Sequence, residues 1–374
     1  MAASAKATEA FRAGALKRGV VSEHFRDVEG LKASSIGIGT YLGDSDSETD
    51  DLYRRAIAEA IELGVNVIDT AINYRCQRSE RTIGRVLADL ESRGVERDQL
   101  IVCTKGGYLP FDGAPPPNAR EYFQKRFVDP GILASEDLVS GAHAMSPPFL
   151  RNQVASSLAN LGVDAIDVYY LHNPEAELAA VDRKAFFARL RRAFECLEAV
   201  ADEGRIRFYG TATWNGYRGK PQRKEFLPLE DVASIAREVA GDGHRFRFVQ
   251  APYNLAMTEI FTEQNQPLAG KAVSLTAAAD AFGVHVVSSA SIAQGRLQSG
   301  LPEWLGKLFR GLSTDSQRAL QFARSTPGVK TALVGMKTEA HVQENLGVAR
   351  VAPAPIEDFL KLFEVQSGPN REIL

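Results

Sequence analysis

Residues 66–84 read NVIDTAINYRCQRSERTIG, and this run indicates how the chain folds. Its first apolar residues predict a short buried strand that delivers Asp69 at its C-terminal end. Tyr74 lies five residues further along, and a helix is expected to begin near Ser79 and Glu80. In parallel α/β proteins the chemistry lies at the C-terminal ends of strands and on the loops that follow them. An acid and a phenol at this place therefore indicate a proton-transfer site.

Two further polar residues follow predicted strands in the same way. Lys105 comes directly after the apolar run 100–104, and His172 comes after the run 166–171. Each residue alone has an ordinary structural explanation, such as a turn cap for Asp69 or a half-buried ring for Tyr74. A lysine at a strand end is usually solvated, and a single histidine is usually structural. Four such residues at the ends of three strands favour one shared site.

Short β-branched runs alternate with amphipathic stretches along the chain, which is typical of repeated βα units. Strands are predicted at residues 35–38, 65–69, 100–104, 166–171, 206–210, 246–250, 284–288 and 331–334. Helices are predicted at residues 49–63, 79–92, from 146 onward, and at 184–203, 229–239, 271–282, 315–324 and 339–348. Eight such units predict an α/β fold of the (β/α)8 TIM-barrel type. An open doubly wound sheet is the alternative, and it is disfavoured because no predicted strand leads into a Gly-x-Gly-x-x-Gly turn.

We expect a single barrel domain over residues 1–374, with residues 1–18 as a flexible or helical N-terminal extension. Two stretches interrupt the βα rhythm. The insertion 106–144 carries three consecutive prolines and several aromatic residues, and the segment 291–313 follows the seventh predicted strand. Long loops on the C-terminal face of a barrel are usually binding loops or lids. We expect the insertion to help shape a substrate pocket, the alternative being a surface excursion whose aromatic rings pack on each other.

Composition limits the class of protein. Apolar residues make up 44% of the chain and charged residues 24%, which is enough for a full core. The net charge of −3 gives no basic surface for nucleic acid or anionic membrane, and no apolar run reaches the ~18 residues that span a bilayer. The three cysteines have neither a disulfide pattern nor metal-ligand spacing, and the six histidines form no metal-binding motif. We therefore expect a cytoplasmic protein without a metal site.

The order and local context of Asp69, Tyr74, Lys105 and His172 resemble the catalytic tetrad of the aldo-keto reductases. The resemblance runs from a β-hairpin before the sequence Ile-Gly-Ile-Gly-Thr to residues 344 and 345, which is most of the chain. It implies a barrel with an N-terminal hairpin and long loops on the C-terminal face. It also implies hydride transfer between a nicotinamide and a carbonyl or alcohol, with Tyr74 as the general acid or base.

The resemblance assigns roles to the rest of the site. Lys105 would stabilise the phenolate of Tyr74, Asp69 would hold Lys105 in place, and His172 would orient the carbonyl oxygen. The cofactor-binding residues implied by the family pattern are Thr40, Ala212, Thr213, Gln250, Ser289, Gln294, Lys337, His341, Glu344 and Asn345. The implied substrate-binding residues are Tyr108, Phe111, Asn173 and Trp214. The resemblance favours NADP(H) over NAD(H) as the cofactor and a small carbonyl or alcohol as the substrate.

The nucleotide positions depart from the family pattern. Ala212 and Thr213 stand where a Ser-Asn pair usually clamps the carboxamide, and Ser289 stands where a tyrosine usually stacks on the nicotinamide. His341 replaces the arginine that grips the 2′-phosphate, although Lys337 could substitute for it. These changes motivate an alternative function, a nicotinamide-binding regulatory or scaffold protein like the potassium-channel β subunits. Redox-neutral use of a tightly bound nucleotide also stays open, as do the substrate and the oligomeric state.

Overall fold

The computed structural model describes residues 1–365, so the end of the predicted domain, residues 366–374, lies outside the described part. Eight parallel strands close into a barrel in the order β11-β12-β3-β4-β5-β6-β7-β8. Their bounds are β3 (Ile36–Gly39), β4 (Val67–Asp69), β5 (Ile101–Gly106), β6 (Ile166–His172), β7 (Ile206–Ala212), β8 (Phe246–Pro252), β11 (His285–Ser289) and β12 (Val329–Gly335). This closed barrel confirms the predicted (β/α)8 fold.

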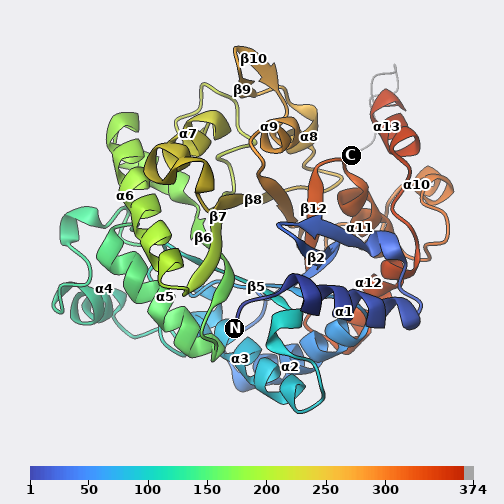
Figure 1. Cartoon of the computed structure of the whole chain (residues 1–374), viewed down its shortest axis with the longest axis horizontal. Helices are drawn as coiled ribbons and strands as arrows, with labels where there is room; N and C mark the ends of the chain where they lie inside the picture. Colours follow the sequence, from blue (N-terminus) through green and yellow to red (C-terminus); the bar gives the residue numbers. More distant parts are fainter. Residues whose placement is uncertain (366–374) are drawn as a thin grey trace.

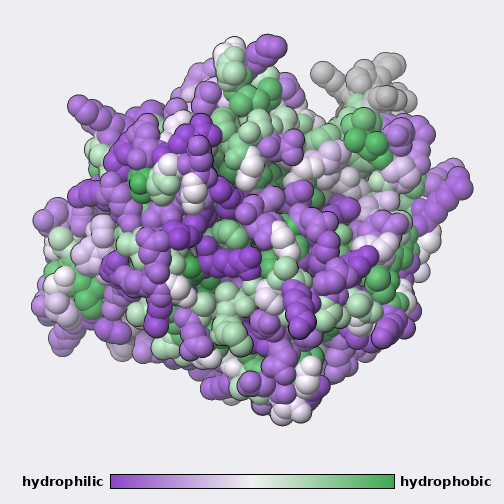
Figure 2. Space-filling model, in the orientation of Figure 1, coloured by the Kyte–Doolittle hydropathy of each residue, from purple (hydrophilic) through white to green (hydrophobic). Residues whose placement is uncertain are grey.

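Helices form the outer layer of the barrel, as Figure 1 shows. Those that follow the eight barrel strands are α2 (Ser47–Glu62), α3 (Arg78–Glu91), α5 (Pro147–Leu161), α6 (Arg183–Asp202), α7 (Leu229–Ala240), α9 (Leu275–Ala281), α11 (Asp315–Ser325) and α12 (Glu339–Leu346). Several begin at a side-chain cap, as where Asp46 accepts a hydrogen bond from the backbone N–H of Thr49 at 2.8 Å. The surface in Figure 2 is largely hydrophilic, with apolar residues in small separate groups.

The strands alternate between two environments. Val67, Ile101, Val168 and Phe248 belong to an apolar cluster inside the barrel, whereas their chain neighbours pack outward against the helices. Successive side chains of a strand point to opposite faces, so every second residue after these four also points inward. That phase reaches Asp69, Lys105, His172 and Gln250 at the C-terminal ends of their strands. The fold therefore turns these polar groups toward the barrel axis.

A hairpin lies at the other end of the barrel. Strands β1 (Phe25–Val28) and β2 (Leu31–Ser34) pair antiparallel, and Val28 and Leu31 join the apolar cluster inside the barrel. The turn between them has positive φ at Glu29 (51°) and Gly30 (77°), as a two-residue hairpin loop requires. Helix α1 (Ala5–Lys17) precedes the hairpin, and Lys32 N–H donates to Thr8 Oγ1 at 3.1 Å.

The predicted helix 271–282 is wrong in its first part. Strands β9 (Gln266–Leu268) and β10 (Lys271–Val273) form a second hairpin there, and α9 begins only at Leu275 after a cap by Ser274. Ala269 and Gly270 both have positive φ, which makes a tight turn rather than a helix. Gln266 Oε1 accepts a hydrogen bond from Leu229 N–H at 2.9 Å and so ties this hairpin to α7.

The insertion 106–144 contains a short helix, α4 (Ala119–Phe123), and packs against the start of α5 through a small apolar cluster. That cluster is formed by Leu109, Phe127, Leu133 and Ala144 of the insertion and by Phe149 of α5. Three further α-helices of the described residues are α8 (Glu259–Thr262), α10 (Glu303–Leu308) and α13 (Ile356–Val365). Over residues 1–365, no helix is both long enough and apolar enough to cross a membrane.

Candidate active site

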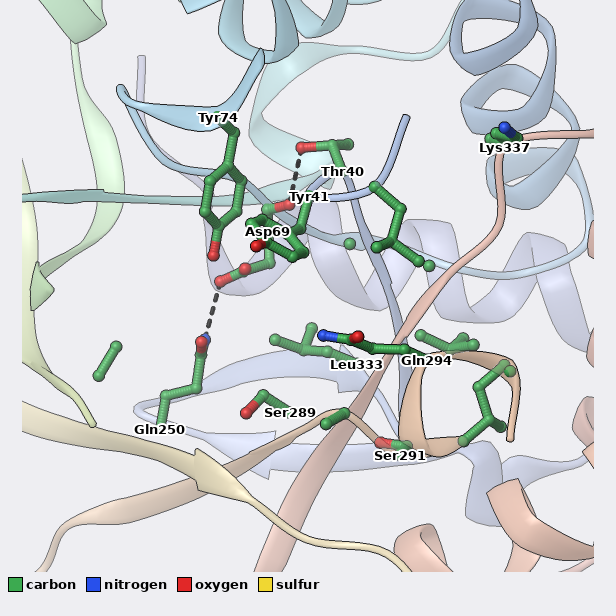
Figure 3. Close-up of a pocket in the computed structure, with 18 of the residues that line it drawn as sticks. Thr40, Tyr41, Asp69, Tyr74, Gln250, Ser289, Ser291, Gln294, Leu333 and Lys337 are labelled. Carbon is green, nitrogen blue, oxygen red and sulfur yellow. Dashed lines mark hydrogen bonds between the residues drawn. The ribbon is translucent and has the colours of Figure 1, made fainter. Parts of the chain in front are cut away.

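Asp69, His172 and Gln250 line a cavity of about 1040 Å³ at the C-terminal end of the barrel. Figure 3 shows part of it: Tyr74 and Gln250 approach Asp69 from two sides, while Lys337 lies well away from them. The loops after β3, β4, β5, β6, β7, β11 and β12 supply the remaining walls. The cavity therefore joins residues that are far apart in the sequence.

Asp69 and Lys105 form a buried ion pair below the cavity. Lys105 Nζ donates to Asp69 Oδ1 and to the carbonyl oxygen of Thr70, the latter at 2.8 Å. Asp69 Oδ2 accepts a second hydrogen bond from Gln250 Nε2 at 2.8 Å. Burial by itself lowers the pKa of Lys105, but the charge of Asp69 and the contact with Tyr74 raise it above its usual value. The lysine is therefore protonated at neutral pH.

Tyr74 lies directly beside that cation. Its hydroxyl accepts from Lys105 Nζ at 3.4 Å, and the ammonium is 4.9 Å from the centre of the phenol ring. Burial raises the pKa of Tyr74 above its usual value, and the opposing charge of Lys105 offsets this only in part. The lysine acts in the direction expected from the sequence, but burial dominates. The phenol is therefore protonated at neutral pH and positioned to donate a proton.

His172 completes the group on the side of β6. Its ring packs edge-on against Tyr74 and Tyr108, with centroid distances of 5.7 and 5.1 Å. Burial, with the charge of Lys105 as a second cause, lowers the pKa of His172 well below its usual value, so the imidazole is neutral. Its backbone oxygen accepts from His143 Nε2 at 2.9 Å. A neutral imidazole next to a phenol can orient a carbonyl oxygen by a hydrogen bond.

A buried carboxylate holds the loop after β7. Glu175 Oε1 accepts the backbone N–H groups of Trp214, Asn215 and Gly216 at 2.9, 3.2 and 3.3 Å. Burial raises the pKa of Glu175, although these donors act to lower it. The loop also carries Thr213, so Glu175 links the loop after His172 to this wall of the cavity.

The predicted binding residues fall into two groups. All ten residues assigned to the cofactor line the cavity, as do Tyr108, Asn173 and Trp214 from the predicted substrate set. Phe111 is not in the cavity wall, because it stacks on Phe123 within the insertion, with ring centroids 5.1 Å apart. The insertion thus contributes Tyr108 to the cavity, and its other aromatic rings largely pack on each other.

Some residues of the wall were not predicted. Tyr41, Leu42, Asn73 and Arg296 all line the cavity. Tyr41 follows directly on Thr40, and Asn73 precedes Tyr74, so position next to a predicted strand end was the available signal. Arg296 lies in the segment 291–313, where a cation among polar residues has no distinctive pattern.

The cavity fits a nicotinamide dinucleotide. Within the described residues, Asn73 Oδ1 and Thr213 Oγ1 are buried without a hydrogen-bond partner although both residues line the cavity. Buried polar atoms are rarely left unpaired, so these two indicate a polar ligand. Arg296, Lys337 and His341 line the same cavity and offer positive charge for phosphate groups. For a metal there is no comparable site: no group of three or more His, Cys, Asp or Glu in residues 1–365 could hold an ion.

Comparison with known proteins identifies the family. The model of the aldo/keto reductase family matches residues 35–300, which is more than half of the chain. The chain belongs to the aldo/keto reductase family. As a member it is an oxidoreductase, and the resemblance drawn from its sequence is confirmed. The match begins at the first barrel strand and includes all four residues of the predicted tetrad.

One curated relative of this aldo/keto reductase is the NADH-specific methylglyoxal reductase of Escherichia coli, 30% identical over 187 residues. That match covers 49% of the chain, and the chain spans about half, 49%, of the relative. Among solved structures, an aldo/keto reductase from Klebsiella pneumoniae in complex with NADP and acetate is 21% identical, with a TM-score of 0.61 over 94% of this chain and 98% of the other. A glycerol dehydrogenase from Gluconobacter oxydans is 19% identical, with a TM-score of 0.64 over 92% and 95%. These structures share the fold.

Proposed function

We propose that this aldo/keto reductase is a carbonyl reductase or alcohol dehydrogenase that depends on NAD(P)H and uses Tyr74 as its general acid or base. One observation carries the proposal: the Tyr74 hydroxyl lies 3.4 Å from Lys105 Nζ in the wall of the cavity. Asp69 fixes that lysine from below. A regulatory protein that only bound a nucleotide would have no need of a phenol paired with a buried cation.

The residues divide the work of a carbonyl reduction. Tyr74 gives its proton to the carbonyl oxygen, and Lys105 stabilises the phenolate that is left. Neutral His172 orients that oxygen by donating a hydrogen bond, while Asp69 keeps Lys105 charged and in place. A bound nicotinamide supplies the hydride. In the reverse direction the phenolate accepts the proton of the alcohol, which is the same step run backwards.

For the cofactor, the cavity residues favour NADP(H) over NAD(H). Gln250, Thr213 and Asn73 would hold the nicotinamide end, and Glu344 and Asn345 the adenine end. Lys337 and His341, assisted by Arg296, would hold a 2′-phosphate. The relatives differ on this point, since one is named for NADH and another was solved with NADP. The substrate is a small carbonyl or alcohol, and Tyr108, Asn173 and Trp214 form the part of the cavity wall that would contact it.

A cytoplasmic location belongs to the same proposal. Cys76, Cys103 and Cys196 are all free and buried. Unpaired cysteines suit a reducing compartment.

Replacement of Tyr74 by Phe tests the proposal. Y74F should lower kcat by about 10²- to 10⁴-fold, because phenylalanine keeps the ring but has no hydroxyl to donate a proton. Nucleotide affinity, measured by fluorescence titration with NADPH and NADH, should not change. Tyr253 is also buried but lies outside the cavity wall, so Y253F is the matched control and should keep its kcat.

Turnover should be measured in a screen of aldehydes and ketones with both NADPH and NADH. Full activity of Y74F would reject the proton-donor role. Tight nucleotide binding by the unaltered protein without turnover of any carbonyl would instead favour the regulatory alternative.

A further inference from the structure

The chain turns sharply directly after Tyr74. Three consecutive residues, Arg75, Cys76 and Gln77, have φ values of 48°, 56° and 68°, in the left-handed region. None of them is glycine, so each adopts this conformation at a cost in free energy. Such strain persists only where the surroundings hold the backbone in place, and it is common next to functional residues.

The side chain of Arg75 supplies much of that hold. It is buried, with 1% of its side-chain surface exposed, and its Nη2 lies 2.6 Å from Asp50 Oδ1. Its Nε donates to the carbonyl oxygen of Asp44 at 2.8 Å, and its Nη2 donates to that of Asp46 at 3.2 Å. The guanidinium also lies 5.5 Å from the ring centre of Tyr53 on α2. One side chain thus joins the turn after Tyr74 to the start of α2.

Asp50 is shared between two arginines. Its second oxygen lies 2.6 Å from Nη2 of Arg78, the first residue of α3, and its side chain is only 8% exposed. A buried carboxylate held by two guanidinium groups fixes both of them in direction. Asp50 therefore clamps the turn at each end, through Arg75 and through Arg78.

The same contacts fix the other wall of the cavity. The loop 41–46, which receives the bonds of Arg75, carries Tyr41, and the Tyr41 ring packs on Tyr74 with centroids 5.0 Å apart. Tyr53 Oη donates to the carbonyl oxygen of Leu42 at 2.8 Å. Displacement of Arg75 would therefore release Tyr74 and the ring against it together.

The insertion supports the turn from outside. Gly113 N–H donates to the carbonyl oxygen of Cys76 at 2.8 Å, and Gln77 Nε2 donates to that of Phe111 at 2.9 Å. These bonds contact only the backbone of the insertion, whereas Arg75 connects the turn to the cavity wall. Arg75 is therefore the residue whose loss should reach the phenol.

We infer that Arg75, held by Asp50, is a positioning residue that keeps the strained turn in place and so sets the Tyr74 hydroxyl beside Lys105. Its effect on turnover rests on the proposed function. Its effect on the position of the Tyr74 phenol is independent of that function and can be observed without turnover.

Two variants at position 75 separate the strain from the contacts. R75A and R75G both remove the guanidinium, but only glycine adopts a positive φ without cost. Misplacement of a catalytic group by ~1 Å can cost about 100-fold in rate, so R75A should lower kcat by about 10- to 100-fold. Nucleotide affinity should change much less than kcat, and R75G should recover part of the lost kcat. D50N, which keeps the side-chain size, serves if R75A does not fold.

The position of the phenol is read by nuclear magnetic resonance with carbon-13 at the tyrosine Cζ atoms. The chain has ten tyrosines, and Y74F assigns the signal of Tyr74. We expect that signal to be displaced in R75A and to be closer to its original position in R75G. Arg324 is also buried, at 1% exposure, and lies outside the cavity wall, so R324A is the control for loss of a buried arginine.

The outcomes separate the two proposals. If the Tyr74 signal in R75A is unchanged, and thermal stability falls as in R324A, the inference is wrong whatever the activity. If the signal moves in R75A but the unaltered protein reduces no carbonyl, Arg75 positions the phenol and the proposed function is wrong.

Discussion

At the scale of single residues, burial competes with neighbouring groups to set the charge of each residue at the site. It keeps the Tyr74 phenol protonated and His172 neutral, whereas Lys105 stays charged because Asp69 and Tyr74 outweigh the effect of burial on its pKa. The sequence supplied the residue types and their order, and these sufficed to predict that the four residues lie together, while their catalytic roles stay a prediction. It could not predict the balance between burial and the charge of Lys105, because that balance depends on how tightly the loops close around the ring.

The raised pKa of Tyr74 predicts different pH dependences for the two directions. Reduction needs the neutral phenol, so its rate should not fall from about pH 6 to about pH 9, below the usual phenol pKa near ~10. Oxidation of an alcohol needs the phenolate, so its rate should rise about tenfold per pH unit over the same range. The lowered pKa of His172 adds no acid limb in that window. Single-turnover kinetics with saturating nucleotide would measure both. A fall in the reduction rate near neutral pH would contradict the assignment.

Some cavity residues that the sequence did not predict are direct chain neighbours of residues that it did predict. Tyr41 and Asn73 sit next to predicted residues, but a loop side chain can turn either way. Phe111 illustrates the reverse case, since its ring turns to Phe123 and only its backbone contacts the turn after Tyr74. Sequence position alone does not fix the direction of a loop side chain.

At the scale of elements, the loop after β7 depends on one carboxylate from the loop after β6. E175A should leave three backbone N–H groups without their acceptor, each worth about 1 kcal/mol or more, and should loosen the wall that contains Thr213. We expect weaker nucleotide binding with a smaller change in kcat, because Tyr74 lies on the loop after β4 and Lys105 lies in β5. Equilibrium titration with NADPH and steady-state kinetics would test this.

E175Q is the matched control. Its amide oxygen can still accept from the backbone, so it should bind nucleotide more tightly than E175A. Equal affinity of E175A and the unaltered protein would show that Glu175 does not support this wall.

Element boundaries were predictable where the hydrophobic period was regular. The barrel strands and their main helices agree with the sequence pattern to within a few residues. The hairpin of β9 and β10 was missed because its strands are very short and half exposed. Such strands are stabilised by tertiary contacts, such as that of Gln266 with α7, which leave no periodic pattern.

At the scale of the whole molecule, His24 makes stability depend on pH. It is fully buried between the hairpin and α11, and burial together with the charge of Arg324 lowers its pKa to about 3. The unfolded chain binds a proton at this histidine below about pH 6.5, whereas the folded chain does not. The free energy of unfolding should therefore fall as pH drops below about 6.5, by up to ~1.4 kcal/mol per unit, until the folded histidine also titrates.

Urea unfolding at pH 6.5 and pH 5 would measure the effect. Between these pH values the free energy of unfolding of the unaltered protein should fall by about 2 kcal/mol more than that of H24N, which has no titrating group at position 24. Since carboxylates are common to both proteins, the difference isolates His24. Equal losses would mean that His24 is protonated in the folded protein as well.

The closure of the barrel was the best predicted property of the molecule, because eight strand and helix patterns agree with one another. The shape of the cavity was the least predictable. Its walls come from loops after seven strands, and their geometry depends on contacts such as those of Arg75 and Glu175 that join segments distant in sequence.

The strand order has a consequence for how such a protein can diversify. Asp69, Lys105 and His172 lie at the ends of the adjacent strands β4, β5 and β6, whereas the residues proposed to hold the phosphates and the adenine follow β11 and β12. Chemistry and coenzyme choice therefore occupy separate arcs of the ring, joined by the bond from Gln250 to Asp69. Mutational drift in one arc can alter coenzyme preference while the other is inherited intact. A library randomised at Arg296, Lys337 and His341 would thus explore coenzyme use on a constant catalytic background.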